Sequence, residues 1–414
     1  MMRVFSDKAG GTGTLGKRGR RGMALLMVIT TIAVLTSVVV EFAYSTHVDV
    51  RLAANARDAL RAQYLAKSAT NFARVLLYVQ SLLDRSVGQA SMNFRVWEAI
   101  PVHGDAIRGF VEAARGEEEA TPVGSLPPAQ LSQHLGQLVP AEGLQPFGNY
   151  QGTFFAEIED EEAKINLNKL NNPGLSGAFT AQLVFQLISD ERWDFLFEEE
   201  NTHRERVTRE EFLIRIKDFI DENEVESALD LTLATGVFAD TASDEERHYV
   251  RYPQRYRPKN ALFDSMDEIH LVAGMSERLA AAFQDRFTVY PDINSKLNVN
   301  TRDPMQRLTI LRLMAREPHH PAFENLYTVE SMLRELDVMQ ASMPFAPLTP
   351  QQFAAVLQMH GLEARQDVMN TEFSTTSQTY TIRASGQAGD VVQTITTVVR
   401  LDGGLGKVLY YRED

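Results

Sequence analysis

KRGRRGMALLMVITTIAVLTSVVV, residues 17–40, joins a basic leader to eighteen residues that carry no charge. An apolar run of about 18 residues is long enough to cross a hydrocarbon core of ~30 Å as a helix, and a cationic flank holds its leading end in the cytoplasm. The stretch therefore predicts a membrane span, with the rest of the chain on the opposite side of the membrane.

The apolar run continues into a rod. No glycine or proline occurs in residues 23–87, which allows roughly 95 Å of helix at ~1.5 Å per residue. A secretory signal peptide would end in small residues of Ala-x-Ala type, whereas Glu41, Phe42 and Tyr44 follow the span directly. Beyond the span, apolar residues recur at helical spacing between charged ones. The sequence predicts one continuous helix whose apolar face packs on a domain or on a partner helix.

The composition is that of an exported protein whose bulk is soluble. The chain has 414 residues, 44% of them hydrophobic, which is enough for two compact domains beyond the rod. Its formal net charge is -14, and residues 1–22 contribute +5, so the chain without them carries -19. Such acidity argues against a nucleic-acid partner. The absence of cysteine excludes disulfides, thiol catalysis and thiolate metal sites.

After the predicted long helix, the spacing of apolar, polar and turn-forming residues changes three times along the chain. Residues 103–149 mix glycine, proline and an acidic run, which predicts a linker or loose insertion. Residues 153–160 alternate like a half-buried strand, and helical periodicity then dominates as far as residue 364. The expected helical segments are 176–190, 191–200, 208–222, 265–273, 276–286, 303–316, 328–336 and 350–359. Three alternating runs close the chain, 379–386, 391–401 and 407–411, with glycine-containing turns between them.

The junction at Gly22 resembles the processing site of type IV pilin-like proteins. In that family a prepilin peptidase cuts after a glycine between a cationic leader and an apolar helix, and the new terminal residue is often Phe or Met, as Met23 is here. The fifth residue after the cut is usually Glu, but here it is Met27. That departure is characteristic of the minor pseudopilin K (GspK) family of type II secretion.

A physical reason for the missing glutamate is available. In a growing fibre this carboxylate would neutralise the terminal amine of a neighbouring subunit, because an unpaired charge in hydrocarbon costs several kcal/mol. A subunit at the tip of the fibre has no further neighbour to pair with. Met27 therefore fits a tip subunit.

Several strings elsewhere also resemble the GspK family, and the resemblance covers nearly all of the chain from Gly22. They are Lys164-Ile165-Asn166-Leu167-Asn168, Ile216-Lys217-Asp218-Phe219-Ile220-Asp221, Tyr256-Arg257-Pro258-Lys259-Asn260-Ala261, Leu271-Val272-Ala273-Gly274-Met275, Leu297-Asn298-Val299-Asn300-Thr301 and Val408-Leu409-Tyr410-Tyr411-Arg412-Glu413. The family implies an α+β fold in which a long N-terminal transmembrane and stalk helix packs on a small antiparallel, pilin-like sheet. A large, mainly helical domain of helix-hairpin-helix or SAM-like type is inserted into it. The block-wise order of the sequence gives the same outline.

The resemblance also implies how the chain is divided and where it resides. The expected parts are a prepilin leader at 1–22, a transmembrane and stalk helix at 23–87, a linker or insertion at 88–149, a first pseudopilin β part at 150–168, an inserted helical domain at 169–364 and a second β part at 365–414. The family implies cleavage between Gly22 and Met23, methylation of Met23, and a single pass through the inner membrane with the N-terminus cytoplasmic and the bulk periplasmic. The implied partners are the prepilin peptidase, the other minor pseudopilins, the major pseudopilin and the inner membrane.

An acidic cluster is the strongest candidate for a metal-binding site in this sequence. Its members are Asp218, Asp221 and Glu222 on one face of a predicted helix, and Asn223, Glu224 and Glu226 in the loop that follows. Oxygen ligands at a helix–loop junction suit calcium, which takes about six to eight of them, and the family implies calcium in the helical domain. The family's downstream acidic string is displaced, because residues 229–241 intervene before Asp244-Glu245-Glu246. Two interpretations stay open: calcium held by Asp218, Asp221, Glu222, Asn223 and Glu224, or a plain solvated acidic face.

The string around Gly274 looks like the turn of a helix-hairpin-helix, which in repair proteins offers backbone amides to phosphate. The surrounding residues here are acidic, among them Asp264, Asp267 and Glu268, so we expect a structural hairpin and no nucleic acid. The sequence contains no Gly-x-Ser-x-Gly elbow, no phosphate-binding glycine loop and no His-Glu-x-x-His zinc helix. We therefore expect no enzyme activity.

These features predict a minor pseudopilin, a non-enzymatic subunit at the tip of the periplasmic pseudopilus that helps to start fibre assembly and to export folded proteins. Two alternatives stay open. A minor type IV pilin would have a smaller domain and usually Glu at position 27. A membrane-anchored periplasmic helix-hairpin-helix protein would bind a ligand or DNA and would not be cut by prepilin peptidase.

Overall fold

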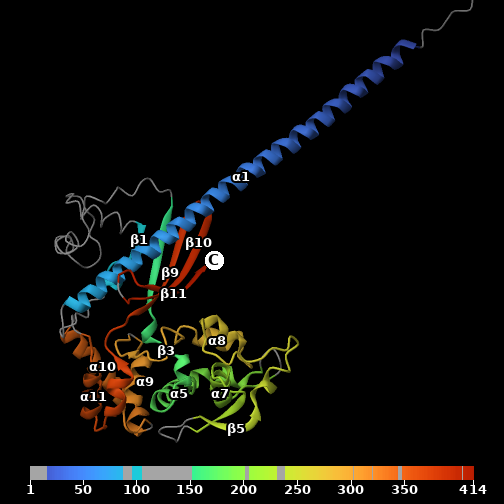
Figure 1. Ribbon diagram of the computed structural model, residues 1–414. Helices are drawn as coiled ribbons and strands as arrows, with labels where there is room; N and C mark the ends of the chain where they lie inside the picture. The colour runs from blue at the N-terminus through green and yellow to red at the C-terminus, as the bar shows by residue number, and fades with distance from the viewer. Residues whose placement is uncertain are drawn as a thin grey trace, which may run out of the picture.

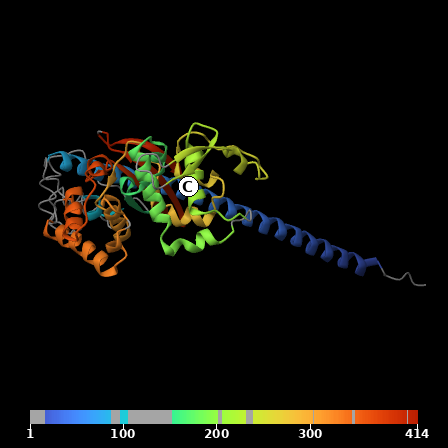
Figure 2. The ribbon, with the colours of Figure 1, turned by 90° about the horizontal axis from the view of Figure 1, so that it is seen from below.

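A long N-terminal helix, an antiparallel sheet and a mainly helical part make up the protein (Figure 1). The computed structural model describes residues 16–86, 96–104, 152–200, 205–230, 238–301, 303–318, 320–343, 347–402 and 404–414. The sheet lies against the C-terminal half of the long helix, and the helical part lies beyond the sheet, away from the start of that helix (Figures 1 and 2). The predicted combination of a long apolar helix with an antiparallel sheet is confirmed.

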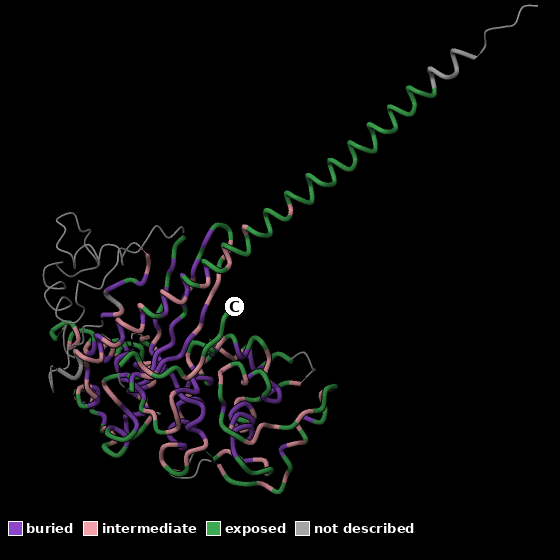
Figure 3. Tube along the Cα trace, turned by 45° about the horizontal axis from the view of Figure 1, so that its top comes forward, coloured by how far each residue is buried: buried purple, intermediate pink, exposed green. Residues whose placement is uncertain are grey.

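Helix α1 (Gly16–Ser86) is uninterrupted, as the lack of glycine and proline in residues 23–87 predicts. Its stretch Met23–Leu82 is long and apolar enough to cross a membrane. Residues 23–47 are exposed throughout, whereas from Ala62 onward one face of the helix is buried (Figure 3). One helix is therefore both the apolar rod and part of a folded core.

The large sheet has the strand order β1-β2-β9-β10-β11, and every pairing in it is antiparallel. Its strands are β1 (Val102–His103), β2 (Thr153–Asp160), β9 (Thr379–Ala388), β10 (Val391–Arg400) and β11 (Lys407–Glu413). Exposed and buried residues alternate along β2, as its apolar spacing predicts. The buried face packs on α1 in a core that includes Leu65, Ala69, Phe154, Ile382 and Val399.

Two differences from the expected domain boundaries concern this sheet. Helix α2 (Val96–Ala99) and β1 come from the region expected to be a linker at 88–149, and β1 extends the sheet by pairing with β2. The rest of that region, 88–95 and 105–149, lies outside the described residues. At the other end, helix α12 (Gln366–Thr371) and β8 (Phe373–Ser374) belong to the helical part, so the chain returns to the large sheet at Thr379 and not at residue 365.

The helical part occupies the chain between β2 and β9. Its remaining helices are α5 (Leu175–Ile188), α6 (Asp194–Glu198), α7 (Arg209–Ile220), α8 (Glu277–Phe283), α9 (Pro304–Met314), α10 (Leu326–Ser342) and α11 (Pro350–Met359). Its remaining strands are β3 (Ile165–Asn166), β4 (Val225–Leu229), β5 (Phe238–Asp244), β6 (Phe287–Thr288) and β7 (Leu297–Asn298). The 3-10 turns are η2 (Glu161–Ala163), η3 (Leu167–Asn171), η4 (Glu191–Trp193), η5 (Glu245–His248), η6 (Met266–Leu271) and η7 (Pro321–Phe323). The helix expected at 191–200 is the 3-10 turn η4 followed by the α-helix α6, and the one expected at 265–273 is the 3-10 turn η6 alone.

Two units with the same plan make up this helical part. The first begins at Lys164-Ile165-Asn166-Leu167-Asn168 and the second at Lys296-Leu297-Asn298-Val299-Asn300. In each unit the opening two-residue strand, β3 or β7, pairs in parallel with a strand at the unit's far end, β6 or β8. Each unit also contains a turn at a glycine in the left-handed region, Gly274 with φ 82° or Gly361 with φ 76°.

In each unit, an equivalent asparagine joins two segments of that unit that are far apart in the sequence. Asn168 donates to the carbonyls of Phe263 and Val289 at 3.0 and 3.1 Å and accepts from the Phe263 amide at 2.9 Å. Asn300 donates to the carbonyls of Leu348 and Thr375 at 3.1 and 3.2 Å and accepts from the Leu348 amide at 2.8 Å. Each buried amide thereby satisfies backbone groups of two distant segments.

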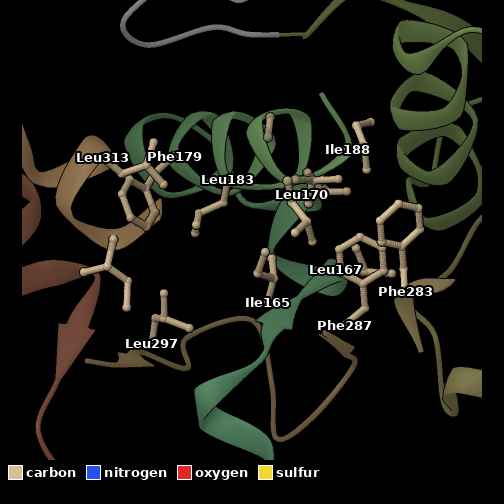
Figure 4. Close-up of a cluster of buried hydrophobic side chains, with 14 of the residues drawn as sticks. Ile165, Leu167, Leu170, Phe179, Leu183, Ile188, Phe283, Phe287, Leu297 and Leu313 are labelled. Atoms are coloured by element: carbon tan, nitrogen blue, oxygen red, sulfur yellow. The ribbon is translucent and has the colours of Figure 1, made fainter. Parts of the chain in front are cut away.

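One hydrophobic core runs through both units. Helix α5 supplies Phe179 and Leu183, which face Leu297 and Leu313 of the second unit and Ile165 of the first (Figure 4). The sheet joins this body through a buried polar network at the end of β2. There, Glu161 pairs with Lys164 at 2.8 Å and accepts from Thr381 of β9 at 2.7 Å, while Asp160 accepts from Ser377 at 2.7 Å. The sheet and the helical part therefore share buried contacts.

Candidate cation site

Helix α7 positions the first two carboxylates of the site. Its start is fixed by a capping box between Thr208 and Glu211, and its last turn leads to Asp221 at the C-cap. Asp218 and Asp221 are three residues apart and therefore lie on one face of the helix. Both are buried.

The third carboxylate comes from beyond the β4–β5 hairpin. Glu245 begins the 3-10 turn η5, where Asp244 is the N-cap. The amide of Glu245 donates to the carbonyl of Glu224 at 3.4 Å, which holds the turn against the end of α7. Carboxylate oxygens of Asp218, Asp221 and Glu245 all lie within 4.8 Å of one another. The three acids form one buried cluster.

Several oxygens in this cluster have no hydrogen-bond partner among the described residues. They are both carboxylate oxygens of Glu245, which is 1% exposed, and Oδ1 of Asp221. The other oxygen of Asp221 accepts from Lys217 at 2.8 Å and from Asn223 at 3.0 Å, and Asp218 accepts from the Ser227 amide at 3.1 Å. A buried ionised carboxylate without donors is unfavourable, so these oxygens can take up either a proton or a cation.

The electrostatics of the cluster agree with that interpretation. Burial raises the pKa of Glu245 to about 8; the side chain of Asn260 opposes this shift, and the nearby carboxylates of Asp218 and Asp221 add to it. Burial likewise raises the pKa of Asp218 to about 6. The pKa of Asp221 is also raised by burial, although Lys217 opposes the shift. Three carboxylates that resist ionisation together are what a divalent cation would stabilise.

The donor set fits a hard cation such as calcium. All the unmet atoms are oxygens, which calcium prefers, and three carboxylates against one lysine leave a negative site. Asn260, which lies beside Glu245, adds a further amide oxygen without a partner among the described residues. Its backbone has φ 48°, and its Nδ2 donates to the Asn223 carbonyl at 2.9 Å, which fixes the side chain. Backbone carbonyls or water would have to complete the coordination.

The structure brings together only part of the ligand set expected from the sequence. Asp218 and Asp221 are in the cluster, but Glu222, Asn223 and Glu224 are exposed and lie outside it. Asn223 instead supports the site, because its side chain donates to Asp221 and accepts from the Val225 amide at 2.7 Å. Sequence reasoning did not include Glu245 in this set. Its signal was the string Asp244-Glu245-Glu246, which residues 229–241 separate from α7.

No family model matches the chain, and no curated protein matches its sequence. Among solved structures, the chain is similar to the GspK–GspI–GspJ complex from the type 2 secretion system of enterotoxigenic Escherichia coli. The TM-score is 0.44 and the identity 18%, over 66% of this chain and 84% of that one.

The other residues singled out by the sequence lie elsewhere. Gly22 and Met23 are within α1, and Met23 is exposed. At the hairpin turn, the Gly274 amide donates to the hydroxyl of Tyr252 at 2.6 Å. A Cβ at position 274 would also overlap the guanidinium of Arg215, which is buried. The turn is therefore packed against protein groups, which is the geometry of a structural hairpin.

Proposed function

We propose that the chain is a minor pseudopilin of GspK type, a non-enzymatic subunit at the tip of a periplasmic pseudopilus. The observation that carries the proposal is the division of α1. Residues 23–47 are exposed and mainly apolar, whereas Ala62, Ala69 and Leu77 of the same helix are buried against an antiparallel sheet. A helix of this kind anchors the domain in a membrane and offers its free half to other helices.

The proposed sequence of events begins with a precursor inserted in the inner membrane with its leader in the cytoplasm. Prepilin peptidase cuts between Gly22 and Met23, and Met23 is methylated. The exposed part of α1 then packs with the helices of the major and the other minor pseudopilins. The fibre supports the export of folded proteins across the outer membrane.

The tip location is supported by two features. Met27 stands where a fibre subunit would carry a glutamate to pair with its neighbour, and it is apolar and exposed. The helical part lies at the end of the molecule away from the start of α1 (Figure 1), where it would clash with a subunit stacked above. Both features fit the last subunit of a fibre, which has no further subunit above it.

We further propose that the cluster of Asp218, Asp221 and Glu245 binds calcium. The ion would supply the positive charge that the unmet carboxylate oxygens lack. Because the ligands come from α7 and from the turn after the β4–β5 hairpin, binding would fasten the end of that hairpin to α7.

The test of the pseudopilin proposal is the N-terminus of the mature chain. The full-length protein is co-expressed with a prepilin peptidase, and the product is analysed by mass spectrometry. A terminus at Met23, methylated or not, is the expected result, and a Gly22→Leu variant should keep its leader. An intact leader in the unchanged chain, or a cut after the apolar run, would overturn the proposal.

A further inference from the structure

The open edge of the large sheet lies next to an exposed line of apolar side chains on α1. β11 is the last strand of the sheet, and the described part of the chain places no strand beyond it. On β11, Val408 and Tyr411 are 42% and 48% exposed, and on the adjacent face of α1, Leu60 and Tyr64 are 55% and 62% exposed. We call these four residues the edge patch.

Polar contacts join the two halves of the edge patch into one surface. The ammonium of Lys67 lies 5.9 Å from the centre of the Tyr64 ring and 3.0 Å from the carboxylate of Glu413. Glu413 also accepts from Gln63 at 2.5 Å and from the hydroxyl of Tyr411. Helix and strand therefore present their apolar residues side by side, with one ion pair between them.

The backbone of β11 has hydrogen-bonding groups that face away from the sheet. Thr394 and Asp414 exchange both backbone hydrogen bonds, at 2.9 and 3.1 Å. Because such pairs alternate along an antiparallel ladder, the amide and carbonyl of Tyr411 and Glu413 point outward. An outward row of donors and acceptors beside apolar side chains is a template for an added strand.

An exposed aromatic residue lies on the same side of α1 as the edge patch, nearer the membrane span. Phe42 and Leu60 are eighteen residues apart, which is about five helical turns, so they lie on the same side of α1, with Asp49 between them on that side. Phe42 is 72% exposed. A partner that covers both the edge patch and Phe42 must itself reach the membrane.

An antiparallel dimer of this chain does not fit the edge. Antiparallel pairing of two β11 strands places a twofold axis perpendicular to the sheet, which reverses the direction of α1 in the second copy. The two apolar spans would then point to opposite sides and could not enter one membrane. A partner anchored in the same membrane must therefore keep its own helix parallel to α1.

We propose that the edge patch binds a second protein anchored in the same membrane by an N-terminal apolar helix. An extended segment of this partner adds to β11, and its helix covers Leu60 and Tyr64. The inference rests on the proposed function and adds to it the surface through which a pilin-like neighbour docks.

The experiment is site-specific photo-crosslinking of the full-length chain in its native cells. A benzophenone amino acid replaces Tyr64, Tyr411 or, as a control, Tyr327 of α10, which is 84% exposed and far from β11 in sequence. The expected result is one common partner at positions 64 and 411 and none at 327. Peptide mapping should find position 411 joined to an extended segment and position 64 to the partner's apolar helix.

A pair of substitutions tests strand addition itself. Tyr411→Pro removes an outward amide and leaves the ladder with β10 intact, whereas Tyr411→Ala removes only the side chain. Tyr411→Pro should lower the yield at position 64 at least about tenfold, and Tyr411→Ala should lower it less, with equal protease resistance of the two folded chains. Equal yields in the two variants, no product at position 64, a soluble partner or a second copy of this chain would each overturn the inference. The N-terminus of the same samples separates the two proposals, since a terminus at Met23 without a cross-link refutes only the edge patch.

Discussion

Gly386 of β9 lies directly against the backbone of α1 at Ala62. A Cβ at position 386 would overlap the carbonyl oxygen of Ala62 and lie 2.6 Å from the amide nitrogen of Ala66. The φ of Gly386 is outside the left-handed region, so the close contact and not the backbone angle requires glycine. The membrane rod and the sheet are one folded unit because their backbones touch at this point.

The first prediction follows from this contact. Gly386→Ala should lower the free energy of unfolding by about 1–3 kcal/mol, because helix and strand must separate to admit a methyl group. Denaturant unfolding of the full-length chain in detergent measures the change. Gln387→Ala, at the exposed next residue, is the matched control and should have little effect. Equal effects of the two substitutions would show that α1 and β9 can separate at this contact with little loss of stability.

The second prediction separates the two ligand sets for calcium. At a calcium concentration about a hundred times its Kd, binding should stabilise the fold by about 2.7 kcal/mol relative to chelator. Glu245→Gln and Asp221→Asn should remove most of this gain, since they neutralise buried cluster members. Glu222→Gln and Glu224→Gln should keep it, because these side chains are exposed. Thermal unfolding with calcium or chelator gives the answer, and no calcium effect on the unchanged chain would reject the site.

Long periodic segments were predictable from the sequence. Helix α11 occupies the expected residues 350–359, and the three alternating C-terminal runs are β9, β10 and β11. Over ten or more residues, the apolar spacing distinguishes a period of 3.6 from a period of 2. The continuity of α1 followed from the absence of glycine and proline.

The pairings inside the helical part were not predictable in this way. The two-residue strands β3 and β7 are too short to show alternation, and their partners lie far along the chain. The role of Glu245 depends on the β4–β5 hairpin, which brings η5 back to α7. In the sequence alone, residues 229–241 only separate Glu245 from the other acidic residues of the cluster. The likeness of the two units is present in the sequence as two matching strings, 164–168 and 296–300, but strings of five residues do not show that Asn168 and Asn300 make equivalent bonds.

The third prediction concerns pH in the absence of calcium. The ordinary pKa of a glutamate is near 4.5, and burial raises that of Glu245 to about 8 in the fold. The folded state therefore holds this proton more tightly than the unfolded state, and the stabilisation present at low pH is lost as the pH rises through about 8. In chelator, Glu245→Gln should be increasingly more stable than the unchanged chain from pH 5 to pH 8, because its amide stays neutral. Thermal unfolding across that range measures the difference, and a constant difference would mean that Glu245 titrates normally.

The fourth prediction uses the two equivalent asparagines. Asn168→Ala and Asn300→Ala each leave buried backbone groups of two segments without partners, and each should lower the free energy of unfolding by about 1–3 kcal/mol. Asn370→Ala, at an exposed position, is the control and should stay within about 0.5 kcal/mol. Because one hydrophobic core spans both units, the two substitutions should shift the same cooperative transition. Two separate transitions, each sensitive to only one asparagine, would show instead that the units fold independently and that α5 does not couple them.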